Sequence, residues 1–166
     1  SFTAHHWWED NTTEDEDKRF FEAVDIAADL LDTSIEDSFW FQQSRHIILA
    51  QAQAAQEGPN PHILMLDKFV PFKSHLLADE LKNIDIKFIV YPHQNEEDVW
   101  NLSGTAPNRQ EFHSVKVHLP TAWGGLADEE LRKQSNCPGI ISCNSNLRSA
   151  KFKDKESALH VAQSLI

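Results

Sequence analysis

The chain has 166 residues, a formal net charge of −11 and hydrophobic and aromatic shares of 40% and 10%, which are ordinary for a soluble globular protein. A chain of this length hides roughly 70% of its unfolded surface on folding, so it can form one domain, alone or with a helical extension. Every apolar run falls short of the ~20 residues that span a bilayer, and this argues against a membrane protein.

The charge is unevenly distributed along the chain. Residues 1–40 contain 12 Asp and Glu against 2 Lys and Arg, whereas residues 41–166 contain 14 against 13. The first segment would repel a phosphate backbone, while the second is neutral enough to carry a local basic site. We therefore expect any contact with nucleic acid in the second segment.

The N-terminal part of the sequence predicts two helices. Residues 13–16 (TEDE) fit a capping box, and apolar residues then recur at helical spacing up to about Leu31. Ser34 and Asp37 can cap a second helix, which Gly58-Pro59 ends. Because only two or three residues join the helices, we predict an antiparallel helical hairpin over residues 1–58, with an acidic outer face in solvent.

After Pro59 the pattern changes to short apolar runs separated by turns and helical segments. The residues Asn95–Asp98 are typical of an antiparallel turn between two strands. These patterns predict an α+β domain over residues 59–166, with a mixed sheet and flanking helices. Strands are expected at about 63–66, 86–90, 99–102 and 140–141, and helices at about 71–82, 128–134 and 154–165.

The first candidate site follows the first predicted strand. Lys and His side chains can hold phosphate oxygens, and an Asp at a strand end can orient either of them. The structural alternative is that the Asp caps a turn, the lysines are solvated and the His packs in the core. The residues concerned are Asp67, Lys68, Lys73 and His75.

The second candidate site is the segment 138–155, PGIISCNSNLRSAKFKDK. Its cations near a helix start can attract phosphate, and an ordinary basic loop is the alternative interpretation. The loop at 145–150 contains no glycine, so its backbone should not reach positive φ cheaply or approach a ligand closely. The cations are Arg148, Lys151, Lys153 and Lys155.

Other chemical signatures are missing from the sequence. The nine histidines show no metal-ligand spacing, and nucleophile elbows, P-loops and dinucleotide fingerprints are absent. Trp123-Gly124-Gly125 is interpreted as a tight turn anchored by the tryptophan. Cys137 and Cys143 form neither a disulfide framework nor a CxxC pair, which favours buried, inert thiols and an intracellular protein.

Four blocks carry a resemblance to a known family. They are ILMLDKFVPFKSHL at 63–76, IKFIVYPHQ at 86–94, LPTAWGGLADEEL at 119–131 and PGIIS at 138–142. In this order they resemble the C-terminal half of the melanocyte-proliferating-gene (MYG) family of DHH-superfamily hydrolases and 3′–5′ exonucleases. The resemblance runs from about Trp8 to Leu165.

The resemblance implies a substrate-binding role for both candidate sites. The block that contains Asp67, Lys68, Lys73 and His75 matches a family hallmark near the cleft between two lobes. Asn144 stands where relatives carry a histidine before a glycine-rich loop, and Arg148 and Lys151 follow it. The resemblance further implies a missing N-terminal DHH-like lobe that holds divalent metal, manganese by expectation, and RNA or another phosphodiester as substrate.

These inferences lead to two expectations for function. The first is the substrate-binding half of a metal-dependent phosphodiesterase, which is not catalytic on its own and contains no metal ligands. The second is a diverged, non-catalytic module for protein interaction or homodimerisation, with the acidic helices as its contact face. Salt-sensitive binding of single-stranded RNA distinguishes the first from the second.

Overall fold

The computed structural model describes residues 13–166, which fall into two units, 13–43 and 44–166. Each unit has its own internal packing. The side chains of Thr13 and Glu14, half of the predicted capping box, lie outside the described residues, as do His5 and His6.

The N-terminal segment forms one helix instead of the predicted hairpin. Helix α1 runs without a break over Thr13–Glu57, through the expected turn. The Thr33 hydroxyl donates a hydrogen bond to the Asp29 carbonyl at 2.9 Å, and Ser34 donates to Leu30 at 2.8 Å. Both side chains therefore bond to the preceding turn of the helix, and Ser34 does not cap a new one. The sequence around them also lacks the Gly or Pro that would end a helix.

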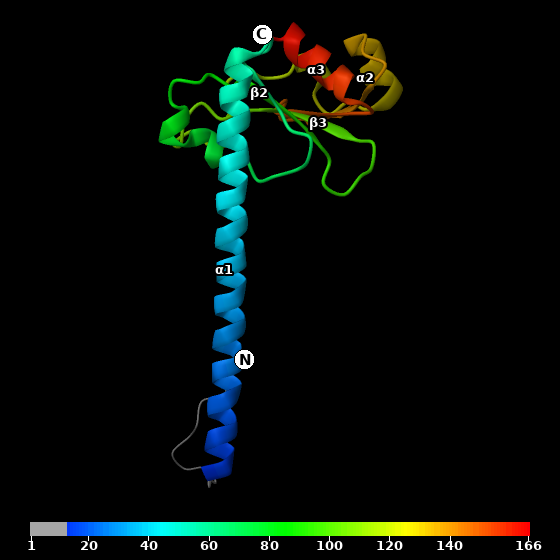
Figure 1. Cartoon of the computed structure of the whole chain (residues 1–166). Coiled ribbons are helices and arrows are strands. Elements are labelled where there is room, and N and C mark those ends of the chain that lie inside the picture. Colours follow the sequence, from blue (N-terminus) through cyan, green and yellow to red (C-terminus); the bar gives the residue numbers. More distant parts are fainter. Residues whose placement is uncertain (1–12) are drawn as a thin grey trace. The chain divides into compact units, whose positions relative to one another are not determined.

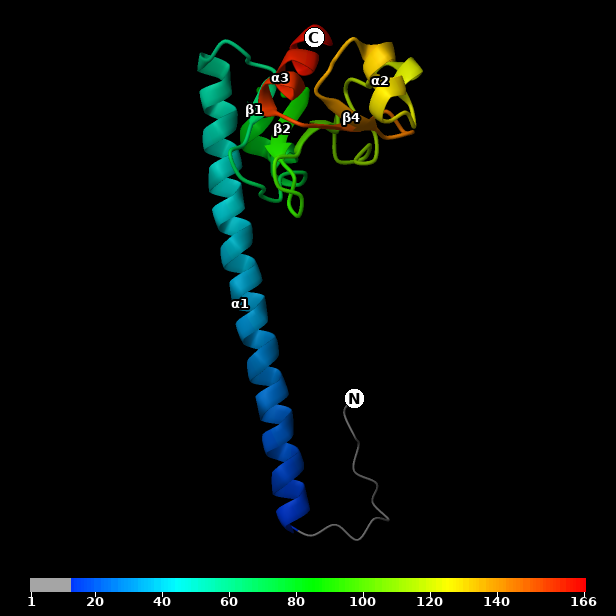
Figure 2. The same cartoon turned by 90° about the vertical axis from the view of Figure 1, so that its right-hand side faces the viewer.

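Residues 44–166 contain a five-stranded mixed sheet, which confirms the predicted α+β class (Figures 1 and 2). Its strand order is β1-β2-β3-β5-β4, with β1 parallel to β2 and the other pairs antiparallel. Residues 95–98 join β2 to β3 as the predicted antiparallel turn. Strand β5 was not predicted. The strands are β1 (Ile63–Met65), β2 (Phe88–Pro92), β3 (Trp100–Gly104), β4 (Ile140–Cys143) and β5 (Ser149–Phe152).

The two faces of the sheet are covered by different elements. One face packs with α2 (Asp128–Ser135) and α3 (Lys155–Ser164), and its core includes Phe88, Leu102 and Phe152. Over β1 and β2 the other face packs with the last turns of α1, through Ile48 and Ala52, and with residues 70–81. Strands β1 and β2 are therefore buried on both sides, which explains their nearly continuous apolar sequences.

Two of the three helices predicted after α1 are present in the structure. Helix α3 begins after Asp154, whose carboxylate Oδ1 accepts a hydrogen bond from the Ser157 amide at 2.7 Å as an N-cap. Helix α2 also lies where it was expected. The predicted helix over 71–82 is wrong, because Ala78 takes an extended conformation and leaves two short 3₁₀ turns, η1 (His75–Leu77) and η2 (Asp79–Leu81). Burial of Phe72 and Leu81 against the sheet overrides local helix propensity there.

The glycine pair and the cysteines have the predicted structural roles. Trp123, in the 3₁₀ turn η3 (Thr121–Trp123), packs in the core, and Gly125 takes a φ of 75°, which favours glycine. Cys137 and Cys143 are both buried and free. Burial raises the pKa of the Cys143 thiol to about 11, so it stays protonated and unreactive at neutral pH.

Helix α1 is long, but its charged residues leave no apolar stretch of membrane-spanning length. Within residues 13–166, none of the helices is both long enough and apolar enough to cross a bilayer.

Candidate functional site

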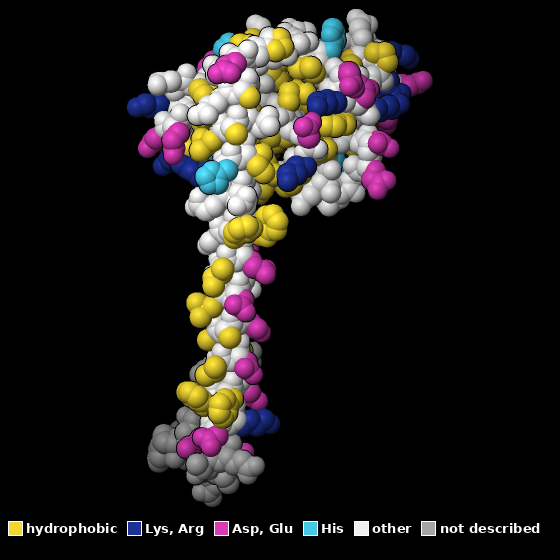
Figure 3. Space-filling model, viewed as in Figure 1, with side chains coloured by type: hydrophobic (Ala, Val, Ile, Leu, Met, Phe, Trp, Pro, Cys, Tyr) yellow, Lys and Arg dark blue, Asp and Glu magenta, His cyan; other side chains and the backbone are white. Residues whose placement is uncertain are grey.

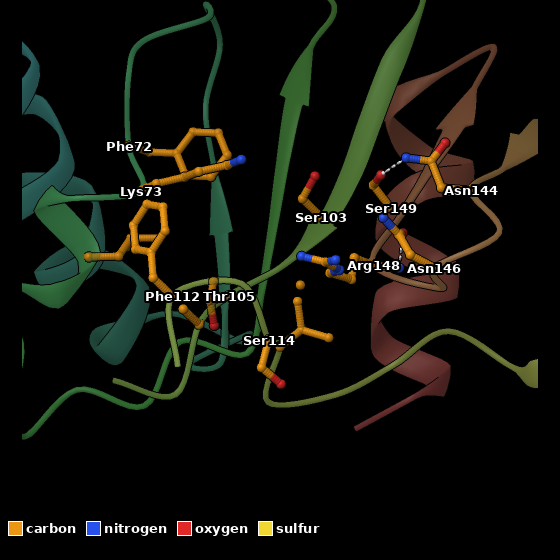
Figure 4. A pocket seen from close by; sticks show the side chains of 14 residues that line it. Phe72, Lys73, Ser103, Thr105, Phe112, Ser114, Asn144, Asn146, Arg148 and Ser149 are labelled. Atoms are coloured by element: carbon orange, nitrogen blue, oxygen red, sulfur yellow. Dashed lines mark hydrogen bonds between the residues drawn. The ribbon is translucent and has the colours of Figure 1, made fainter. Parts of the chain in front are cut away.

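A pocket of about 210 Å³ brings together three of the predicted site residues, Lys73, Asn144 and Arg148 (Figure 4). It lies at the end of β3, between the segment before η1 and the loop that joins β4 to β5. Hydroxyl and amide groups and two phenyl rings complete its lining. These additional side chains are Phe72, Ser103, Thr105, Phe112, Ser114, Asn146 and Ser149.

Two serines enter the pocket because of the strand register. Ser103 of β3 pairs with Ser149 of β5, and each serine is half-buried and adjoins a buried apolar residue of its own strand, Leu102 or Ala150. Leu102 and Ala150 point into the core beneath α3, so Ser103 and Ser149 face the opposite side of the sheet. The polar–apolar alternation of residues 149–152 (SAKF) was the available signal for β5, and the sequence interpretation missed it.

The loop between β4 and β5 positions Asn144 without any glycine. The Asn144 side-chain amide donates to the Ser149 hydroxyl at 2.6 Å, and the Asn144 backbone amide donates to the Ser149 carbonyl at 3.0 Å. Leu147 takes a φ of 58°, in the left-handed region, at a cost of about 1–2 kcal/mol for a residue with a Cβ. The loop thus reaches positive φ at Leu147, but at the energetic cost that the absence of glycine predicts. Packing of its side chain at the edge of the core compensates for the strain.

Arg148 is held in the pocket wall by contacts from both its side chain and its backbone. Its guanidinium Nη1 donates a hydrogen bond to the His113 carbonyl. Its own carbonyl accepts a hydrogen bond from the Gly104 amide at 2.9 Å. A guanidinium has five N–H donors, and the bond to His113 uses one of them, so the group can also bind an anion in the pocket.

Lys73 and two phenyl rings form the opposite wall, as Figure 4 shows. Lys73 is exposed and follows Phe72, which is anchored in the core at 6% exposure, whereas Phe112 is 40% exposed. The pocket thus has one cation on each wall, with the Ser103 hydroxyl between the walls and the amides on the Arg148 side (Figure 4). This combination suits an anionic ligand with a planar ring.

The remaining predicted site residues lie outside this pocket. The Asp67 carboxylate pairs with Lys155 at 3.0 Å, and the Lys155 ammonium also lies 5.4 Å from the centre of the Trp100 ring. Lys151 forms an ion pair with Glu96, and Lys68 is exposed away from the pocket lining. The predicted cluster of Asp67, Lys68, Lys73 and His75 is therefore not one group.

His75 is buried at 1% exposure, so it cannot contact a substrate in this structure. Burial, and to a lesser degree the nearby Arg45 charge, lowers the pKa of His75 from its usual 6.5. The folded protein consequently favours the neutral imidazole.

This shift predicts a pH dependence of stability. In the unfolded chain His75 has its usual pKa of 6.5, so it takes up a proton more readily there than in the folded protein. The free energy of unfolding is therefore highest above pH 6.5 and decreases as the pH falls towards the folded pKa. Urea unfolding at about pH 7.5 and about pH 5.5 should show a larger loss of unfolding free energy for the unmodified protein than for His75→Gln, by at most about 1.4 kcal/mol per pH unit. His160→Gln, which removes an exposed histidine, is the matched control. Equal losses in the His75 variant and the unmodified protein would contradict the prediction.

The described part of the chain offers no metal centre. Among these residues, no three His, Cys, Asp or Glu side chains form a group that could hold a metal ion. The pocket lining includes two cationic side chains and no carboxylate, a charge balance that does not favour a divalent cation.

Comparison with known proteins gives a consistent relationship. A family model described as MYG1_exonuc, uncharacterised protein family (UPF0160), matches residues 2–166. The chain is 26% identical over 141 residues to a MYG1 protein of Chlamydia muridarum, covering 85% of this chain and 46% of that protein. It is 26% identical over 163 residues to the MYG1 protein YER156C of Saccharomyces cerevisiae, covering 95% and 47%.

A human relative carries a more specific name. The chain is 28% identical over 131 residues to the MYG1 exonuclease of Homo sapiens, covering 76% of this chain and 34% of that protein. The chain thus spans half or less of the length of these curated relatives and corresponds mainly to their C-terminal half. No solved structure matches it.

Proposed function

We propose, from the premise that this chain belongs to the MYG1 exonuclease family, that it is the substrate-binding half of a metal-dependent 3′–5′ exonuclease acting on RNA. Its sheet unit would correspond to the DHH-associated domain of an intracellular enzyme. The observation that carries the proposal is the pair of cations, Lys73 and Arg148, on opposite walls of one pocket.

The pocket chemistry supports a phosphodiester ligand. Lys73 and Arg148 would bind the phosphate oxygens, with Arg148 able to present two parallel N–H donors. The hydroxyls of Ser103 and Ser149 and the Asn144 amide add neutral donors for phosphate or ribose oxygens. Phe112, exposed at the opposite wall, offers a face on which a base can stack.

The chain's residues bind and orient the substrate in this proposal. Divalent metal, proposed to be manganese, would be held by the other half of the whole protein and would activate water for attack on phosphorus. Lys73 and Arg148 would hold the phosphodiester and neutralise part of its charge. The 166-residue chain alone should therefore bind RNA without hydrolysing it.

Fluorescence anisotropy with a labelled single-stranded oligoribonucleotide tests the proposal. We expect binding that weakens with added salt, because phosphate contacts release counterions. The double variant Lys73→Gln/Arg148→Gln should lose about tenfold or more in affinity, since two charge-assisted contacts are removed.

The matched control removes two exposed lysines outside the pocket and outside both predicted sites, as Lys82→Gln/Lys133→Gln. It makes the same change in net charge and should retain most of the affinity. Circular dichroism checks that each variant remains folded. No measurable binding by the unmodified chain, or an equal loss in the control, would contradict the proposed role of the pocket.

One observation favours a second candidate function, a protein-interaction or dimerisation module. Large apolar side chains of α1 between residues 20 and 39 are exposed to solvent. Light scattering that shows a stable dimer, together with no RNA binding, would support this alternative.

A further inference from the structure

The segment 20–39 of helix α1 exposes a continuous row of large apolar side chains. Figure 3 shows apolar groups gathered along one side of this segment and acidic groups along another. The exposed fractions range from 45% to 65%. The row comprises Phe20 (64%), Val24 (45%), Leu31 (64%), Ile35 (65%) and Phe39 (56%); we call it the α1 stripe.

The spacing of these residues makes the stripe a single surface. Steps of four and seven residues, with Ala27 between Val24 and Leu31, place all members within one face of an α-helix. A row of acidic residues follows steps of three and four on the other side. That row comprises Glu22, Asp25, Asp29, Asp32 and Glu36.

The stripe is large enough to mark an interaction site. Because a large apolar side chain can bury ~150–250 Å², its five members expose on the order of 500 Å² of apolar surface. Patches of this size on soluble proteins usually serve an interface. The acidic row limits the apolar surface to one part of the helix, since a carboxylate is costly to bury without a partner. Phe21 (63%), Ile26 (52%) and Leu30 (65%) are also exposed, beside the stripe.

The comparisons show that the relatives extend well beyond the region this chain matches. More than half of the Chlamydia muridarum and Saccharomyces cerevisiae relatives lies outside the region that this chain matches, as the 46% and 47% coverages show. A second copy of the chain is a poorer occupant, because it would bring together two helices with strong negative charge. We infer that the α1 stripe is the docking surface for the N-terminal half of the family's chain. This inference rests on the proposed function, in which that half holds the metal.

The occupant should present an apolar groove that takes an amphipathic helix face. Such a groove binds side chains that recur at helical spacing, and Phe20, Leu31 and Ile35 would be the anchors. The acidic row would remain in solvent on the far side of the helix. Docking would then attach the half proposed to hold metal to the same chain that carries the RNA pocket.

Cysteine labelling tests the inference with a matched pair of variants. Leu31→Cys places a thiol on the stripe, and Asp29→Cys places one in the acidic row two residues away. Each variant is made in the 166-residue chain and in a chimaera that joins the N-terminal half of the Saccharomyces cerevisiae relative to Ser1. A second chimaera uses the Chlamydia muridarum relative. Mass spectrometry measures maleimide labelling at each position, and the buried Cys137 and Cys143 report whether the sheet unit is folded.

The inference predicts that, in the chimaeras, maleimide labelling is slowed at the stripe position and not at the acidic position. In the 166-residue chain both thiols should label at similar rates. In the chimaeras Leu31→Cys should label about tenfold or more slowly than Asp29→Cys, as expected for burial worth at least ~1.4 kcal/mol.

Two results would overturn the inference. Equal rates at the two positions in both chimaeras would show that the N-terminal half does not cover the stripe. Protection of Leu31→Cys in the 166-residue chain that grows with concentration would assign the stripe to a second copy. Neither result depends on RNA binding, so failure of the docking inference is distinguishable from failure of the pocket.

Discussion

Phe152→Ala should lower the free energy of unfolding of the sheet unit by about 3–5 kcal/mol, the usual cost of deleting a buried phenyl ring. Phe152 is fully buried on the interior strand β5, where it pairs with Trp100 of β3 and Ile140 of β4. The cavity would open beneath α3, at the centre of the larger core. A loss this large is a substantial part of the stability of an ordinary domain.

Urea denaturation followed by circular dichroism measures this loss. Lys153→Ala, at the exposed neighbouring position, is the matched control and should change stability by no more than about 0.5 kcal/mol. A cost below about 1 kcal/mol for Phe152→Ala would contradict the view that β5 is a central, fully packed strand.

Gly139→Ala should also destabilise the sheet unit, by about 1–3 kcal/mol, because there is no room for a methyl group. A Cβ at this position would lie 2.1 Å from the Ser157 Oγ and 2.7 Å from the Ser157 Cβ. It would also lie 2.9 Å from Oδ2 of Asp154, the residue that caps α3. The added carbon would therefore push the first turn of α3 away from β4.

A double-mutant cycle with Ser157→Gly isolates this steric cause. Removing the Ser157 side chain should make Gly139→Ala less costly by about 1 kcal/mol or more, since the two closest atoms are gone. Thermal or urea unfolding of the four proteins gives the coupling. If the cost of Gly139→Ala is the same in both backgrounds, crowding against Ser157 is not its source.

Local signals were enough to predict much of the sheet unit. Strands β1 and β2 are buried on both faces, so their sequences are almost continuously apolar and stand out from their surroundings. The start of α3 was predictable because Asp154 is an N-cap residue followed by helical apolar spacing. The antiparallel turn at 95–98 was recognisable from its polar residues.

The two main errors in the predicted fold lie where tertiary contacts, and not local sequence, determine the secondary structure. The hairpin was predicted because serine and threonine favour helix starts, but in α1 Thr33 and Ser34 bond back to carbonyls of the same helix. Strand β5 is only four residues long and buries only Ala150 and Phe152. Its cationic neighbours therefore made the segment resemble a basic loop. Its pairing partners are distant in sequence, and no local pattern reveals them.

The candidate site was only partly predictable for the same reason. Lys73 and Arg148 stood out as residue types that hold phosphate, Asn144 was indicated by the family resemblance, and the three line one pocket. The alternation of residues 149–152 indicated a strand that contains Ser149, but no local pattern places Ser149 beside Ser103, because that depends on the register between β3 and β5. His75 looked like a ligand-binding residue in the sequence, yet its segment turns inward and buries it.

The contact between Arg148 and the His113 carbonyl has a consequence for recognition. An arginine that is already fixed before its ligand arrives loses little further rotamer freedom on binding, and ordering such a side chain would otherwise cost about 0.5–1.5 kcal/mol. The pocket is in this sense preorganised on one wall, whereas the exposed Lys73 must be immobilised by the ligand itself. In the proposed function, Arg148 would therefore be oriented before a phosphate binds, whereas Lys73 would become ordered only on binding.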